Sequence, residues 1–263
     1  MSRNRIDLTL VDRGFFSSRE KARAAILANE VKVDGQPVTK AGHMIATDAT
    51  IEVAEARRFV SRGGHKLEGA LVTFGLDVTG VGALDVGSST GGFTDCLLKR
   101  GAASVVAVDV GYGQLAWELR QDPRVTVFER TNIRHVDAET IGAPFELVVI
   151  DVSFIGLSKV FPHVIPLVAG TGSVLALVKP QFEAGKGRVG KKGVVRESTV
   201  HTSVLGDVVG AVHEAGWQVR GLTWSPIKGP EGNIEFWAWI AQDGGVEIDC
   251  GDIVRRAHEA LGE

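Results

Sequence analysis

The stretch that decides the fold is A-L-D-V-G-S-S-T-G-G-F-T-D, at residues 83–95 of this 263-residue chain. It begins in an apolar run typical of a buried strand, passes through a glycine-rich turn and continues into a helix expected at 93–100. Gly87 permits the tight turn, while Gly91 and Gly92 let a ligand and the neighbouring backbone come close. The spacing G-x-x-x-G-G differs from the G-x-G-x-x-G of dinucleotide-binding enzymes. We therefore expect a strand–turn–helix unit that holds a different kind of ligand.

Apolar runs and helical patterns alternate from this turn onward. Strands are expected at 81–86, 105–110, 125–128, 147–151, 172–178, 219–223 and 235–241, and helices at 93–100, 157–168 and 198–215. Buried strands that alternate with helices form mostly parallel sheets with helices on both faces. The prediction is an α/β domain with a seven-stranded, Rossmann-like, doubly wound sheet.

The beginning of the chain has a different pattern, with two short helices and a few short strands, which indicates a small α+β domain. It is also basic: residues 1–66 hold twelve Lys or Arg and eight Asp or Glu, a net charge of +4, whereas the remainder has a net charge of −7. A basic N-terminal segment followed by an acidic remainder suggests a polyanion-binding module joined to a domain of another kind. We place this domain at 1–56, a linker at 57–62 and the α/β domain at 63–263.

Composition excludes several classes of protein. The chain has 33 glycines but only 8 prolines and no collagen-like repeat. Its apolar runs are far shorter than the about 18 to 20 residues that span a bilayer, and M-S-R-N-R-I-D at the start lacks the apolar core of a signal peptide. Two cysteines, Cys96 and Cys250, are too few for a disulfide framework or a zinc site. We expect a cytoplasmic protein without a metal site.

Acidic and polar residues stand at strand ends near the glycine-rich turn. Asp109 ends the second strand, 22 residues after Gly87, where a carboxylate can accept both ribose hydroxyls of an adenosine. Thr131 and Asn132 follow the third strand and are placed to meet the adenine edge. The predicted adenosyl-cofactor site comprises Asp85, Gly87, Ser88, Ser89, Thr90, Gly91, Gly92, Phe93, Asp109, Val110, Thr131, Asn132 and Asp151. The alternative is a doubly wound fold in which the glycine turn only packs.

Four charged residues stand in unusually apolar surroundings. Lys66 lies in S-R-G-G-H-K-L-E, Asp151 and Lys179 end two strands, and Glu235 begins the last strand. Ligands bind at the carboxyl ends of strands in open α/β sheets. Burying such charges is costly unless they pair. Two lysines and two acids that converge on this edge would satisfy one another.

A basic loop follows Lys179. Residues 179–196 hold six basic residues against one acid, and four glycines lie within 185–193. A loop of this kind, just past the candidate catalytic strand, could grip a phosphate backbone. A disordered, solvated loop is equally consistent with this composition. The candidate RNA contacts in this loop are Lys186, Arg188, Lys191 and Lys192.

The N-terminal stretch resembles the alpha-L RNA-binding motif shared by a small-subunit ribosomal protein, pseudouridine synthases and tyrosyl-tRNA synthetases. The matching residues are the initial arginines, S-R-E-K-A-R-A-A-I and V-x-V-D-G-x-x-V. The resemblance implies that the second helix lies on structured RNA. Arg and Lys on such a helix position the phosphate backbone without reading sequence. The implied RNA-binding residues are Arg3, Arg5, Arg19, Lys21 and Arg23; the alternative is an ordinary basic amphipathic helix.

Nearly the whole chain resembles the TlyA family of ribosomal RNA 2′-O-methyltransferases, a branch of the FtsJ-like enzymes. The motifs that carry the resemblance are, in order, the R-R-F-V linker, S-R-G-G-H-K-L, D-V-G-S-S-T-G-G-F-T-D, D-V-S-F-I and V-K-P-Q-F-E. The resemblance implies a class I methyltransferase fold and S-adenosyl-L-methionine as the cofactor. It also implies ribosomal RNA or ribosomal subunits as partner, with a cytidine ribose as the target.

The same resemblance implies a catalytic tetrad of Lys66, Asp151, Lys179 and Glu235. In this tetrad Lys179 takes the proton of the ribose 2′-hydroxyl. Lys66 and Asp151 set the pKa of Lys179, and Glu235 orients its side chain. This hydroxyl holds its proton tightly at neutral pH, and a lysine accepts a proton only when burial or a neighbouring cation lowers its pKa. The methyl group passes in line from a sulfonium to the oxygen, so positioning supplies much of the acceleration.

Two rival functions remain open at this point. One is a membrane-active haemolysin, a label the TlyA family has carried, although no segment is long enough to span a membrane and no helix has a broad basic and apolar face. The other is a non-catalytic RNA-binding factor in ribosome assembly that uses the fold as a scaffold. The intact set of four charged residues favours an enzyme over such an assembly factor.

Overall fold

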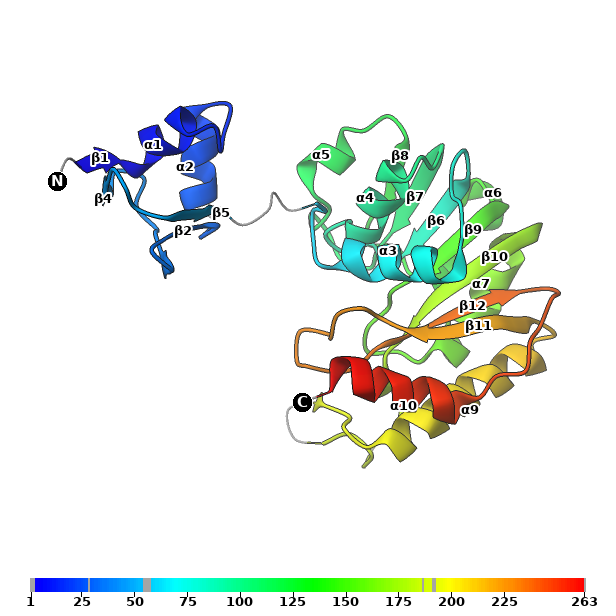
Figure 1. Ribbon diagram of the computed structural model, residues 1–263. Coiled ribbons are helices and arrows are strands. Elements are labelled where there is room, and N and C mark those ends of the chain that lie inside the picture. The colour runs from blue at the N-terminus through cyan, green and yellow to red at the C-terminus, as the bar shows by residue number, and fades with distance from the viewer. Residues whose placement is uncertain (1–2, 28, 54–57, 186, 191–192, 263) are drawn as a thin grey trace. The chain divides into compact units, whose positions relative to one another are not determined.

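The structure is a computed structural model that describes residues 3–27, 29–53, 58–185, 187–190 and 193–262 (Figure 1). The chain forms two compact units. The N-terminal unit comprises Met1–Arg58 and the C-terminal unit comprises Phe59–Glu263. Arg57, the first residue of the predicted linker, lies outside the described residues.

The N-terminal unit is a small α+β domain, as the sequence predicts. Its elements are β1 (Arg3–Arg5), α1 (Ile6–Asp12), α2 (Arg19–Leu27), β2 (Val31–Val33), β3 (Gln36–Pro37), β4 (Met44–Ala46) and β5 (Ile51–Val53). The strands form a three-stranded sheet in the order β3-β2-β5 and a separate β1-β4 pair. Side chains at helical spacing on α1 and α2, Ile6 and Leu10 on the first and Ala22 and Ile26 on the second, are fully buried and form its core.

The C-terminal unit is built on a seven-stranded sheet. Its strands are β6 (Gly82–Val86), β7 (Ser104–Val108), β8 (Val125–Phe128), β9 (Phe145–Ile150), β10 (Val168–Val178), β11 (Gln218–Trp224) and β12 (Phe236–Ala241). Its helices are α3 (Gly63–Phe74), α4 (Gly92–Lys99), α5 (Trp117–Arg120), α6 (Ala138–Ile141), α7 (Phe161–Val164), α8 (Pro180–Glu183), α9 (Ser198–Glu214) and α10 (Cys250–Leu261). Three 3-10 turns complete it: η1 (Ile133–His135), η2 (Leu157–Lys159) and η3 (Ile165–Leu167).

The sheet order is β11-β12-β10-β9-β6-β7-β8. Strands β10, β9, β6, β7 and β8 are mutually parallel, whereas β12 runs antiparallel to both β10 and β11. The predicted seven-stranded, doubly wound α/β fold is therefore confirmed. The chain runs from β6 outward to β8 and then returns to place β9 on the other side of β6. The strand order reverses between the paired strands β6 and β9. Ligands bind at the carboxyl ends of the strands at such a reversal point.

Helices cover both faces of this sheet and form two apolar cores. On one face α3 and α4 pack against strand residues such as Ala83 and Leu175. On the other face, α7, α9 and α10 pack against Leu84 and Val174, which are the sequence neighbours of Ala83 and Leu175. Adjacent residues on a strand thus enter opposite cores, because side chains alternate along a strand. Both faces are buried, which explains why these strands are nearly continuous apolar runs.

The helix expected at 157–168 is wrong in its extent. The structure divides this segment into η2, α7 and η3. Pro162 and Pro166 each stand in the first turn of a new element, because proline lacks the N–H that an uninterrupted helix needs. The C-terminal helix α10 was not expected from the sequence, although its Val254 and Ala257 are buried against the sheet and α9.

A pair of histidines, of which His201 is buried and His258 partly exposed, joins α9 to α10. Nδ1 of His201 lies 2.8 Å from Nε2 of His258, and the His201 ring also packs on Phe236 of β12 at 5.4 Å. His201 is fully buried, and this burial, followed by the nearby His258, lowers its pKa from the ordinary 6.5 to about 4. The folded protein therefore binds a proton at His201 less readily than the unfolded chain does.

Acidification is expected to destabilise the fold through His201. Because its pKa is lower in the folded state, stability is full above pH 6.5 and falls as the pH drops toward 4, by about 2 kcal/mol at pH 5. Urea unfolding at pH 7 and pH 5 measures this loss, and His201→Phe should show a correspondingly smaller one. His213→Gln, on the exposed side of the same helix, is the control. An equal loss in wild type and His201→Phe would contradict the assignment.

Candidate active site

The glycine-rich turn after β6 is held in place by its neighbours. Gly87 has a φ of +85°, and a Cβ added there would lie 2.3 Å from the carbonyl oxygen of Asp151 at the end of β9. No side chain fits between the two strand ends, so glycine is required for this close approach. Asp109 at the end of β7 accepts hydrogen bonds from the backbone N–H groups of Ser89, at 2.8 Å, and Gly111, at 2.6 Å. The carboxylate is thereby fixed next to the turn.

A pocket of about 380 Å³ opens at the carboxyl ends of β6, β7 and β9. This position is the reversal point of the strand order, and the volume lies within the usual range for small-molecule sites. Among the predicted cofactor residues, it is lined by Gly87, Ser89, Asp109, Val110, Thr131, Asn132 and Asp151. Gln114, Arg134, Ser153 and Phe154 also line it, and the sequence did not single them out. Their only local signal is closeness to a strand end.

The other predicted cofactor residues do not line this pocket. They are Asp85, Ser88, Thr90, Gly91, Gly92 and Phe93. Asp85 is fully buried, and its Oδ2 accepts hydrogen bonds from the backbone N–H of Thr94, at 2.9 Å, and from the Thr94 hydroxyl, at 2.6 Å. Burial raises its pKa to about 7. In this position Asp85 anchors the first turn of α4.

The two adjacent glycines of the turn serve helix packing. A Cβ at Gly91 would lie 2.3 Å from Leu119, and one at Gly92 would lie 2.2 Å from Ser61. The next residue, Phe93, is buried in the core, where its ring lies 5.3 Å from that of Trp237. This end of the motif lets α4 approach α3 and α5 closely.

The four predicted catalytic residues form two ion pairs. Nζ of Lys66 lies 2.5 Å from Oε2 of Glu235, and both side chains are buried. Lys179 pairs with Asp151, and its Nζ donates to the hydroxyl of Ser153 at 3.1 Å. The two pairs leave these side chains with no net charge, which lowers the cost of holding them in an apolar site.

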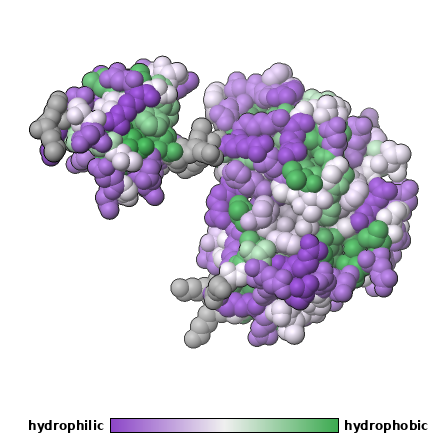
Figure 2. All heavy atoms as spheres, viewed as in Figure 1, coloured by the Kyte–Doolittle hydropathy of each residue, from purple (hydrophilic) through white to green (hydrophobic). Residues whose placement is uncertain are grey.

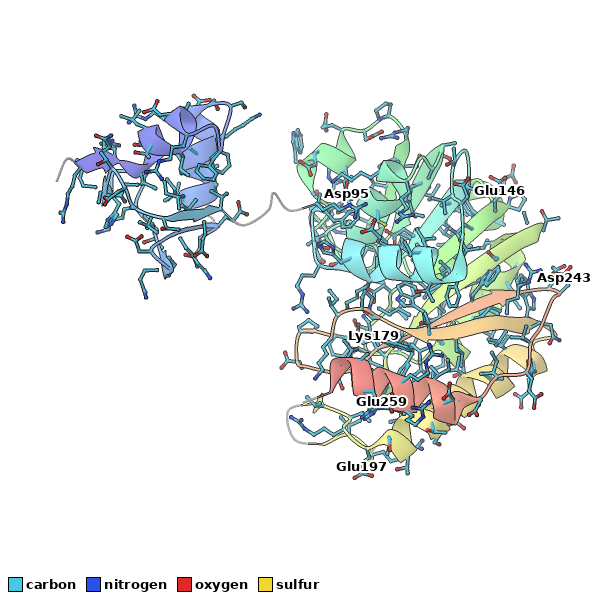
Figure 3. The ribbon with its side chains drawn as sticks, in the orientation of Figure 1. Asp95, Glu146, Lys179, Glu197, Asp243 and Glu259 are labelled. Atoms are coloured by element: carbon cyan, nitrogen blue, oxygen red, sulfur yellow. The ribbon has the colours of Figure 1, made fainter. Side chains whose placement is uncertain are left out.

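Strand register brings the two pairs together. Val178 of β10 stands opposite Phe236 of β12. The next position along this antiparallel register places Lys179 opposite Glu235, and opposed residues project from the same face of a sheet. The backbone N–H of Ser225 donates to the Glu235 carbonyl at 2.8 Å, which extends the sheet to this position on the other side. Figure 3 shows Lys179 at the end of its strand in the C-terminal unit.

Two of the predicted RNA-binding arginines of the N-terminal unit contact a buried acid. Asp7 has no exposed surface, and it accepts hydrogen bonds from Arg5, at 3.0 Å, and Arg19, at 2.9 Å. The hydrogen bond from Arg5 and then that from Arg19 lower the Asp7 pKa to about 2, against the effect of burial. Both arginines remain about half exposed. Asp7 therefore holds their guanidinium groups in fixed positions at the surface.

The remaining predicted RNA contacts are at the surface or outside the described residues. Arg3, Lys21 and Arg23 are exposed. Arg188 donates to the Ala184 carbonyl at 2.6 Å, which ties the basic loop to α8. Lys186, Lys191 and Lys192 lie outside the described residues.

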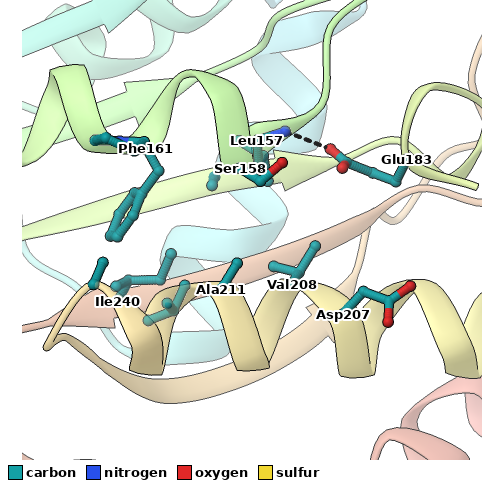
Figure 4. A pocket seen from close by; sticks show the side chains of 12 residues that line it. Leu157, Ser158, Phe161, Glu183, Asp207, Val208, Ala211 and Ile240 are labelled. Atoms are coloured by element: carbon teal, nitrogen blue, oxygen red, sulfur yellow. Dashed lines mark hydrogen bonds between the residues drawn. The ribbon is translucent and has the colours of Figure 1, made fainter.

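A second cavity, of about 140 Å³, lies between α9 and the η2–α7 segment, on the face of the sheet that α7, α9 and α10 cover. Figure 4 shows its apolar lining, which includes Phe161, Ala211 and Ile240, and the hydrogen bond from the Leu157 N–H to Glu183. Burial raises the pKa of Glu183. None of the predicted cofactor or catalytic residues lines this cavity.

The described part of the chain has neither a membrane-spanning helix nor a cluster of metal-binding side chains. No helix within it is both long and apolar enough to cross a bilayer, and it holds no group of three His, Cys, Asp or Glu residues placed to bind a metal. On the face shown in Figure 2, hydrophobic residues form small patches separated by hydrophilic ones.

The chain is similar to known proteins over nearly its whole length. Residues 59–242 match the model of the FtsJ-like methyltransferases, and residues 4–51 match the S4 domain. The chain is 44% identical to the 16S/23S rRNA (cytidine-2′-O)-methyltransferase TlyA of Mycobacterium tuberculosis, over 99% of this chain and 98% of that protein. It is 41% identical to a protein of Brachyspira hyodysenteriae named Hemolysin A, over 89% of this chain and 98% of that protein.

A solved structure matches as well. A protein of Streptococcus thermophilus that carries a hemolysin name superposes with a TM-score of 0.76 at 39% identity, over 99% of this chain and 98% of the other. The family predicted from the motifs is confirmed by these matches. The chain therefore belongs to the TlyA family of FtsJ-like methyltransferases and carries an S4 domain on the N-terminal side of its methyltransferase domain.

Proposed function

We propose that this methyltransferase transfers the methyl group of S-adenosyl-L-methionine to the 2′-hydroxyl of a cytidine ribose in ribosomal RNA. The observation that carries the proposal is the pair of Lys–carboxylate contacts, Lys66–Glu235 and Lys179–Asp151, at the strand edge where the pocket opens. Asp151 belongs to both the pocket lining and an ion pair. A proton acceptor thus adjoins the cofactor pocket.

The pocket residues fit an adenosyl cofactor. Asp109 has both carboxylate oxygens fixed by backbone N–H groups, and the remaining lone pairs can accept ribose hydroxyls. Thr131 and Asn132 line the same pocket and would meet the adenine edge. When bound, S-adenosyl-L-methionine supplies a methyl group on a positively charged sulfur. The Asp151 carboxylate in the lining favours that positive charge.

Lys179 is assigned the proton-transfer step. In its uncharged form its Nζ accepts the proton that the ribose 2′-oxygen gives up as the carbon–oxygen bond forms. Asp151 and Ser153 hold this Nζ in place from the end of β9. Glu235 stands opposite Lys179 when the β10–β12 register is continued by one position, and in this proposal the buried Lys66–Glu235 pair orients Lys179. Fixed donors and charges of this kind need no rearrangement during the reaction.

The RNA substrate is supported by the N-terminal unit and by the relatives. The S4 match covers the segment in which Arg5 and Arg19 are held on Asp7. Exposed guanidinium groups held in one geometry suit phosphate contacts. The M. tuberculosis relative carries rRNA and cytidine 2′-O-methylation in its name, and its match spans both units of this chain.

The test is methyl transfer from labelled S-adenosyl-L-methionine to isolated, unmethylated 30S and 50S ribosomal subunits, followed by mapping of the modified nucleotide. The expected product is a 2′-O-methylcytidine in one subunit or both. Asp109→Ala is the control, because it should lose cofactor binding while it still binds RNA. RNA binding without transfer would favour an assembly factor, and a methyl group on a base would overturn the ribose assignment.

A further inference from the structure

A further pocket, lined by basic residues, lies near the segment that carries Glu235 in the C-terminal unit. Its volume is about 240 Å³, and it is lined by residues of three segments that are far apart in the sequence. Arg196 comes from the stretch after the basic loop, Lys228 from the loop between β11 and β12, and His258 from α10. Figure 1 shows this loop and the end of α10 on the same side of the unit. None of the described residues that line it has a carboxylate.

This pocket is tied to the catalytic residues by the backbone. Its wall includes Ile234, the neighbour of Glu235. The buried Asn233 accepts a hydrogen bond from the Val195 N–H at 2.9 Å and donates to the Gly193 carbonyl at 3.0 Å. A single side chain thus joins the exit of the basic loop to the segment that carries Glu235.

Two further contacts fix Lys228 and His258, which line the pocket. Arg62, four residues before Lys66, donates to the Lys228 carbonyl at 2.6 Å. His258 is fixed by its 2.8 Å contact with the fully buried His201. Because burial lowers the pKa of His201 to about 4, His201 is neutral at pH 7. The pocket is therefore built in advance of any ligand.

We propose that Arg196, Lys228 and His258 form a phosphate-binding subsite that holds the RNA backbone next to the ribose being methylated. The inference rests on the proposed function for the identity of the polyanion. A pocket onto which three basic side chains converge is suited to a phosphate diester. Its link to Glu235 and Lys66 means that a phosphate held here positions the neighbouring nucleotide relative to the tetrad.

The test uses the full-length chain and two variants, Arg196→Gln/Lys228→Gln and Lys228→Gln alone. Binding to a fluorescein-labelled single-stranded RNA is measured over a series of KCl concentrations. Each lost phosphate contact should reduce the slope of log K against log[KCl] by about 0.7, hence by about 1.4 in the double variant. Arg62 donates to the backbone carbonyl of Lys228 and not to its side chain, so Lys228→Gln should keep this contact and the fold.

The matched control is Arg220→Gln, which removes one positive charge from the arginine that pairs with Asp243. Its slope should equal that of wild type. In methyl transfer to ribosomal subunits, the double variant should raise KM about tenfold and keep kcat and cofactor affinity within about twofold. If both variants keep the wild-type slope of log K against log[KCl] and the wild-type KM, the proposed subsite is overturned.

Two outcomes separate this inference from the proposed function. If wild type transfers no methyl group to either subunit, the proposed function fails, while the salt slopes still decide whether the pocket binds RNA phosphates. If the variants lose binding to phosphatidylserine vesicles but keep the wild-type RNA slope, the pocket serves a lipid headgroup and the subsite is overturned.

Discussion

Replacing Lys179 by alanine is expected to lower the rate of methyl transfer about 1,000-fold, a typical effect of removing a general base. Lys179 has the only assigned proton-accepting role, and the ribose hydroxyl does not lose its proton unaided at neutral pH. Cofactor affinity should stay within about twofold, because Lys179 does not line the pocket. Single-turnover transfer to ribosomal subunits and cofactor titration measure the two quantities separately.

Lys159→Ala is the matched control for this variant. Lys159 is an exposed lysine in η2, shortly after the same strand β9 that carries Asp151 at its end. Its removal should leave transfer within about twofold of wild type. Transfer at the wild-type rate in Lys179→Ala would show that another group takes the proton.

Breaking the Lys66–Glu235 pair is expected to cost both stability and activity. Either Lys66→Met or Glu235→Leu leaves one charge buried without its partner, which costs about 3 to 5 kcal/mol of unfolding free energy. The double variant Lys66→Met/Glu235→Leu removes both charges and should recover stability to within about 1 kcal/mol of wild type. Urea unfolding of wild type, the two single variants and the double variant measures the four unfolding free energies of this double-mutant cycle.

Activity should not follow stability in this cycle. The double variant lacks both charges next to Lys179, so its methyl transfer should remain at least about 100-fold below wild type. A stable double variant with nearly wild-type transfer would make the pair a packing feature. A buried ion pair stabilises a fold poorly compared with well-packed apolar side chains. Its presence at this strand edge therefore favours a chemical role.

The glycine-rich motif illustrates the limit of local sequence patterns. The residues assigned to the cofactor run from Asp85, inside the strand, to Phe93, at the start of the helix. In the structure Gly87 and Ser89 line the pocket, whereas Asp85 and Phe93 are buried and do not line it. Which side of a turn a residue faces depends on how α4 packs against its neighbours, and no spacing rule encodes that. The 157–168 segment was different, because its prolines were visible in the sequence and indicate the breaks.

The amino-acid sequence by itself determined the two-part organisation, the seven strands with their buried faces, the family, and the types of residue at the strand ends. These follow from periodicity, turn chemistry and motif order, which are local properties. Only the tertiary structure decided which charges pair: Lys66 meets Glu235 across 169 residues, and Arg196, Lys228 and His258 come together from three segments. Such contacts depend on strand order and register, which are set when the crossover connections pack against the sheet.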